Sequence, residues 1–105
     1  MFKGINVVSV CVPDLDEARL FYGTTLGLGR PIYDLPEAGW IEFSTGGAGN
    51  ISITRAEPGW KPDFATTIVL NVDDCHAAAA ELKRRGRPVR GSAGFPRFRH
   101  VCQLL

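Results

Sequence analysis

Hydrophobic and polar residues alternate along residues 5–12 at the period of a β-strand. One set of alternate positions is wholly apolar: Val8, Val10 and Val12. The other set holds Val7, Ser9 and Cys11. Because successive side chains of a strand point to opposite faces, this pattern predicts a strand with one apolar face and one mixed face.

A helix is expected directly after this strand. Asp14 is a candidate N-cap, and Glu17 follows three residues later, which is the spacing of a capping box. Apolar residues then recur at helical spacing: Leu15, Ala18, Phe21 and Tyr22. Three glycines, at positions 23, 27 and 29, are expected to end this helix.

Three short strands are predicted next, at residues 30–34, 40–44 and 50–55. Segments rich in proline and glycine separate them, as is typical of turns. The first half of the chain therefore has the predicted order β-α-β-β-β.

The strand and helix cap of the first half recur in the second half. Residues 67–74, TIVLNVDD, align with residues 7–14, VVSVCVPD, at a constant offset of 60 positions, and an alanine-rich helix is predicted over residues 75–85. Such a repeat indicates a duplicated supersecondary unit. We therefore predict one domain over residues 1–105, with module one at 1–57, a linker at 58–65 and module two at 66–105.

Composition and charge limit the possible functions. The 105 residues are 45% hydrophobic and 22% charged with a formal net charge of +1, which is typical of a globular protein and gives no field for binding nucleic acid or an anionic membrane. We recognise no secretory signal or membrane-spanning apolar run, so a cytoplasmic protein is expected.

The basic run Lys83-Arg84-Arg85 is interpreted as a solvated helix end. Three cysteines without CxxC spacing indicate neither a disulfide framework nor a zinc site.

The motif V-x-D-L-x-x-A-x-x-F-Y at residues 12–22, followed by L-G-L at residues 26–28, resembles the vicinal oxygen chelate superfamily. That superfamily includes glyoxalase I, extradiol dioxygenases and bleomycin-resistance proteins. The resemblance covers about residues 5–86 and recurs, weakened, at residues 72–74. It implies an α+β fold in which paired βαβββ modules form a cupped mixed sheet around a metal and its ligand.

The final residues fit this family poorly. The second module needs three strands after Gly86, but only nineteen residues remain, so we expect at least its last strand to be missing. Residues 87–105 also show no alternating strand followed by the turn that is usual in the family. Possible codons for residues 95–105, read one base out of frame, give a strand-and-turn sequence of the family's kind. We therefore hypothesise a frameshifted tail. An unpaired sheet edge in either case favours a homodimer.

The resemblance also implies where metal ligands would lie. In metal-dependent relatives the position of Val7 usually holds His or Gln, that of Thr67 often a second His, and a Glu falls near Ser52. The fourth ligand lies on a strand beyond Leu105. A valine and two neutral hydroxyls cannot form the His and carboxylate set that holds zinc, iron or nickel, so we predict no metal and no cofactor.

Strand alternation predicts which residues line the cup instead. The predicted ligand-binding residues are Val7, Ser9, Cys11, Trp40, Glu42, Ser52, Thr54, Thr67 and Asn71. Ser44, Asn50 and Val69 share that face. The alternate residues Ile41, Phe43, Ile51, Ile53, Ile68 and Leu70 should face the helices. An apolar and aromatic wall with scattered polar groups suits a small organic ligand. The alternative is a relict pocket whose polar groups satisfy one another beside water.

Glu42 is the only acidic candidate on this face. If desolvated, it could serve as a general base; otherwise it is an exposed glutamate or one paired with an arginine. Trp40 could stack on a flat ligand or cover the edge of the core. His76 and His100 have no companion at ligand spacing and are interpreted as surface residues.

The sequence therefore favours a metal-independent protein that binds a small organic molecule. Two alternatives stay open. One is a glyoxalase-like lyase, isomerase or dioxygenase whose metal site is completed by a partner chain. The other is a truncated fold without activity.

Overall fold

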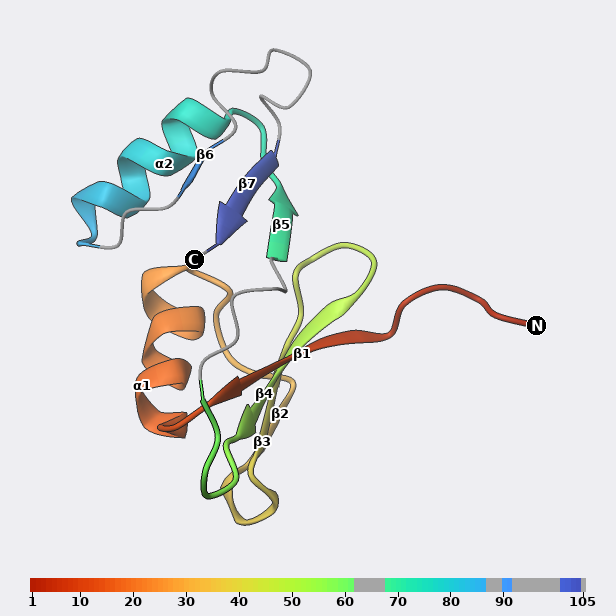
Figure 1. The fold of residues 1–105 in the computed structure, drawn as a ribbon. Coiled ribbons are helices and arrows are strands. Elements are labelled where there is room, and N and C mark those ends of the chain that lie inside the picture. The colour runs from red at the N-terminus through yellow and green to blue at the C-terminus, as the bar shows by residue number, and fades with distance from the viewer. Residues whose placement is uncertain (62–67, 87–89, 92–100, 105) are drawn as a thin grey trace. The chain divides into compact units, whose positions relative to one another are not determined.

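A computed structural model describes residues 1–61, 68–86, 90–91 and 101–104 (Figure 1). The chain divides into two compact units, Met1–Trp60 and Lys61–Leu105. This boundary falls within residues 58–65, where the sequence predicts a linker, while the single-domain organisation stays a prediction.

The first unit has the predicted βαβββ order. Its elements are β1 (Val7–Val12), α1 (Leu15–Leu20), a π-helical turn η1 (Phe21–Thr25), β2 (Tyr33–Leu35), a 3₁₀ turn η2 (Pro36–Ala38), β3 (Trp40–Phe43) and β4 (Asn50–Arg55). The strands form a mixed sheet in the order β1-β4-β3-β2. β1 runs parallel to β4, and the other neighbours are antiparallel. The α+β class is thus confirmed.

One face of this sheet carries the core of the first unit. Its side chains Ile41, Phe43, Ile51 and Ile53 are buried, as the alternation predicts. Leu15, Ala18 and Tyr22 of the helical segment are buried too, and the Tyr22 ring lies 6.1 Å from that of Phe43. We call this the helix face of the sheet.

The helix ends differently from its prediction. Helical periodicity predicts that Tyr22 continues α1, whereas residues 21–25 form a π-helical turn in which the Leu26 amide donates to the Phe21 carbonyl at 2.7 Å. Gly23 permits this turn to pack closely. A side chain there would place its Cβ 3.0 Å from the Gly29 carbonyl oxygen and 3.4 Å from the Phe43 ring.

The second unit comprises β5 (Ile68–Asn71), α2 (Cys75–Arg84), β6 (Arg90–Gly91) and β7 (Val101–Leu104), and its sheet has the order β5-β7-β6 with antiparallel pairs. Of the three strands expected after Gly86, β6 and β7 are present among the described residues. Their backbones pair with neighbouring strands, and backbone pairing does not require alternating side chains. The other residues of the hypothesised frameshifted tail lie outside the described residues, as does His100.

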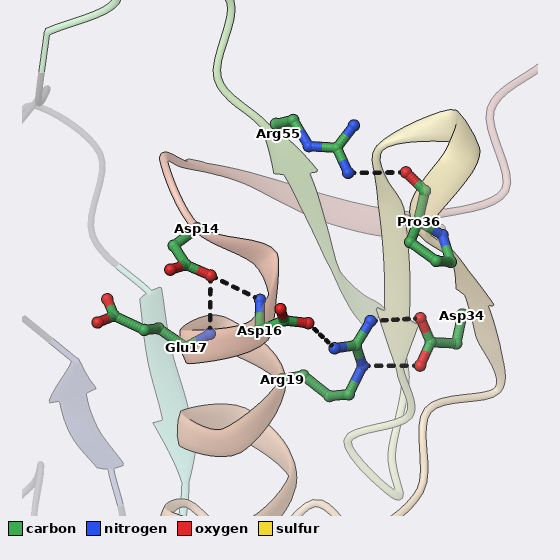
Figure 2. A network of polar contacts seen from close by, with 7 residues as sticks. All are labelled: Asp14, Asp16, Glu17, Arg19, Asp34, Pro36 and Arg55. Carbon is green, nitrogen blue, oxygen red and sulfur yellow. Dashed lines mark hydrogen bonds and ion pairs between the residues drawn. The ribbon is translucent and has the colours of Figure 1, made fainter.

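The repeated strand and cap are confirmed at the level of hydrogen bonds. Asp14 Oδ1 accepts from the Asp16 and Glu17 amides at 2.9 and 3.2 Å (Figure 2). Asp74 Oδ1 accepts from the His76 and Ala77 amides at the same two distances. Each aspartate therefore caps the helix that follows it.

Candidate functional site

Strand register brings most of the predicted binding residues onto one face of the first unit. Two cross-strand rows define it. One row contains Ser9, Ser52, Glu42 and Tyr33, and the other contains Cys11, Thr54, Trp40 and Leu35. Val7 and Asn50 pair at one end. We call these ten residues the polar face; it lies opposite the helix face.

Three predicted face residues lie elsewhere. Ser44 follows the end of β3, and its hydroxyl accepts from the Gly46 amide at 3.1 Å, because the strand turns one residue earlier than predicted. Asn71 and Val69 belong to β5 of the second unit, where both are exposed. Thr67 lies outside the described residues.

Two residues of the polar face were missed in the sequence. Tyr33 lies opposite Glu42 and is 56% exposed, while Leu35 lies opposite Trp40 and is 42% exposed. The predicted strand ended at residue 34, one residue before Leu35. The available signal was the apolar-polar-apolar order of Tyr33, Asp34 and Leu35, which is a short strand pattern.

A pair of serines occupies the middle of the face. The Ser9 and Ser52 hydroxyl oxygens lie 2.6 Å apart across β1 and β4, and either can donate. Ser52 is 0% exposed, whereas Ser9 is exposed. The pair therefore satisfies a buried hydroxyl on an inner strand.

Glu42 is buried on the polar face. It is only 8% exposed, and its Oε2 accepts from the Asn50 side-chain amide at 2.9 Å. The expectation of an exposed glutamate is therefore wrong, and no arginine of the described residues forms an ion pair with it. Asn50 stands two residues before Ser52, the cross-strand partner of Glu42, so it lies diagonally within reach of the carboxylate.

The remaining row is less polar in its contacts. Cys11, Thr54 and Trp40 are all half-buried, and Cys11 is a free thiol. The Thr54 hydroxyl donates to the Val10 carbonyl at 3.5 Å, which is a long hydrogen bond. This row therefore offers chiefly sulfur, methyl and indole surface.

The family model of the glyoxalase/bleomycin resistance protein/dioxygenase superfamily matches residues 4–100. The chain belongs to this superfamily. The match covers most of the chain and agrees with the βαβββ order of the first unit and with the motif at residues 12–28. No curated protein matches the chain.

Metal binding in this superfamily can be tested against the residues of the first unit. Val7 has no lone pair, and the neutral Ser52 hydroxyl is engaged with Ser9, so these two residues do not fit a divalent cation. Among the described residues, no group of three or more His, Cys, Asp or Glu side chains could hold a metal ion. His76 is exposed, as predicted.

Across the described residues, neither helix has the length and apolar content needed to cross a bilayer.

Proposed function

We propose that this superfamily member binds a small organic molecule on the polar face without a metal or another cofactor. One observation carries the proposal. The sheet places buried Glu42, bonded to half-buried Asn50, beside the exposed side chain of Tyr33 and the half-buried indole of Trp40. A few fixed polar groups next to apolar and aromatic surface are typical of small-molecule sites.

Charge narrows the class of ligand. Glu42 is the only acidic residue of the polar face, and the ten residues that define it include no lysine, arginine or histidine. Because like charges in a site oppose binding, a carboxylate or sulfonate ligand is disfavoured. We therefore propose a neutral or cationic ligand.

The aromatic residues narrow the shape of the ligand. Tyr33 and Trp40 lie on neighbouring antiparallel strands, β2 and β3, with Leu35 directly opposite Trp40. Flat ring faces favour planar partners, and they also attract cations. A planar molecule with an amine or another hydrogen-bond donor directed at Glu42 suits both features.

A glyoxalase-like enzyme is the second candidate, and the burial of Glu42 favours it. A carboxylate shielded from water is the kind of group that enzymes use as a general base. This candidate requires a metal whose ligands come from outside the polar face. Metal analysis of the purified protein separates the candidates, because a stoichiometric divalent ion would contradict metal-independent binding.

A dye titration tests the binding proposal. In a Trp60→Phe background Trp40 is the sole tryptophan, so quenching of its emission reports binding near the polar face. We expect the planar cation acridine orange to bind saturably, and the anion 8-anilinonaphthalene-1-sulfonate to bind about tenfold more weakly or not at all. Absence of saturable binding for both dyes would overturn the proposal.

Two variants make the titration specific. Glu42→Gln should remove the preference for the cationic dye. Glu17→Gln makes the same chemical change on the exposed surface of α1 and should retain the preference. Equal effects of the two variants would show that net charge, and not Glu42, sets the preference. The predicted homodimer and cytoplasmic location stay predictions; sedimentation tests the first.

A further inference from the structure

The strand that carries Tyr33 and Leu35 has few neighbours within its own sheet. β2 is three residues long, all exposed, and stands at the end of the strand order with β3 as its only partner in that order. Just before it, the Ile32 amide donates to the Glu42 carbonyl at 2.8 Å. Short edge strands of this kind open easily unless side chains hold them.

A side-chain ion pair holds β2 from the helix face. The Arg19 guanidinium of α1 donates to both oxygens of Asp34, from Nε to Oδ2 and from Nη2 to Oδ1, each at 2.8 Å (Figure 2). The two side chains are 31% and 35% exposed, so the pair is partly shielded. A third bond, from Arg19 Nη1 to Asp16 Oδ1 at 2.5 Å, fixes the guanidinium on its own helix.

A second arginine contacts the chain just past β2. Arg55, at the end of β4, donates from Nη2 to the Pro36 carbonyl at 2.8 Å (Figure 2). Its backbone amide also donates to the Gly39 carbonyl at 3.0 Å. The turn between β2 and β3 is therefore attached to the far end of the inner strand.

The alternation of a strand links this attachment to the polar face. Asp34 stands between Tyr33 and Leu35, so its side chain lies on one face of the sheet and theirs on the other. A bidentate arginine–carboxylate pair fixes orientation as well as distance. Holding Asp34 therefore also limits rotation of β2 about its own axis.

We propose that Arg19 and Asp34 are positioning residues for the polar face, because their ion pair holds Tyr33 and Leu35 beside Glu42 and Trp40. The proposal rests on the proposed function for its consequence in binding. Its structural part, the fixing of β2, is measurable without any ligand.

Hydrogen exchange at the Ile32 amide and acridine orange affinity together test this inference. Asp34→Asn and Arg19→Lys should each accelerate exchange and weaken binding by about 2- to 5-fold. Asp34→Glu retains a carboxylate with two acceptors and should restore most of both. Asp16→Asn is the matched control: it removes the same charge and one bond of the same guanidinium, but leaves the bonds to β2.

Each outcome decides a different point. Exchange that rises equally in Asp34→Asn and Asp16→Asn would overturn the proposal, since the bond to β2 would then have no specific effect. Faster exchange at the Ile32 amide with unchanged dye affinity would overturn it too, because dye binding would then not depend on how firmly β2 holds Tyr33 and Leu35. If neither the wild type nor any variant binds the dye, the proposed function fails separately, and the exchange result alone decides whether the pair fixes β2.

Discussion

The hydroxyl oxygens of Ser9 and Ser52 lie 2.6 Å apart across the parallel strands β1 and β4. Ser52 is buried, and Ser9 is exposed on the neighbouring strand. A buried hydroxyl without a partner is costly, whereas an exposed one can bond to water. The two serines should therefore respond unequally to replacement.

Replacing Ser9 should cost more than replacing Ser52. Ser9→Ala leaves the buried Ser52 hydroxyl without this partner and should lower the free energy of unfolding by about 1–2 kcal/mol. Ser52→Ala removes the buried hydroxyl itself and should cost about 0.5–1 kcal/mol. The double variant should match Ser52→Ala. Urea unfolding followed by Trp40 emission in the Trp60→Phe background measures all three, and strictly additive losses would contradict a coupled pair.

The two helix caps should behave alike. Asp14→Ala and Asp74→Ala each remove a side-chain acceptor for two amides of the first turn, so each should destabilise its helix by about 1 kcal/mol. Hydrogen exchange at the Glu17 and Ala77 amides measures both effects. Asp14→Ser keeps an acceptor at the cap and should nearly restore the wild-type rate. Acceleration in only one helix would show that the repeated caps are not equivalent in strength.

These caps show why local features were predictable. Alternation, capping aspartates and glycine-rich turns depend on residues close together in sequence, so β1, α1, β3, β4, β5 and α2 were found with small errors at their ends. The contacts of the polar face depend on register across strands. The sequence gives no direct sign that Asn50 reaches Glu42, or that Tyr33 lies opposite it, because only strand pairing decides both.

The Arg19–Asp34 pair predicts an acid-sensitive contribution to stability. Hydrogen bonds from the Arg19 guanidinium hold the pKa of Asp34 below the usual value of 3.8. A lowered pKa in the folded state means that the pair stabilises the fold above about pH 4, and that this contribution disappears as the pH falls through the folded pKa. Asp34→Asn should thus be less stable than the wild type at pH 7, by less than about 1 kcal/mol since the pair is partly exposed.

Unfolding measured from pH 7 down to pH 2 checks this sign. The difference between wild type and Asp34→Asn should shrink toward zero at the acidic end. A difference that stays constant or grows on acidification would contradict a native-state ion pair at Asp34.

A second carboxylate with a lowered pKa lies in α2. Arg84 and Arg85 bond to Glu81, which lowers its pKa to about 2. Arg84→Gln should raise this pKa, because the Arg84 hydrogen bond is its largest cause. A carboxyl ¹³C NMR titration measures it directly. Lys83→Gln removes the same charge from the last turn of the same helix and should change the Glu81 pKa much less; an equal shift would indicate a general charge effect.

Gly23 provides the clearest steric prediction in the first unit. Alanine is a better helix former than glycine by about 1 kcal/mol, so propensity alone predicts that Gly23→Ala is stabilising. The added Cβ, however, would lie 3.0 Å from the Gly29 carbonyl oxygen and 3.4 Å from the ring of the buried Phe43. A backbone oxygen and a core ring have little room to move, so the clash should dominate and cost about 1–3 kcal/mol. Gly47→Ala is the control, since a Cβ there meets no atom within 4 Å.

Thermal unfolding should show a lower midpoint for Gly23→Ala and little change for Gly47→Ala. A Gly23→Ala protein as stable as the wild type would mean that the π-helical turn has more space than these distances allow.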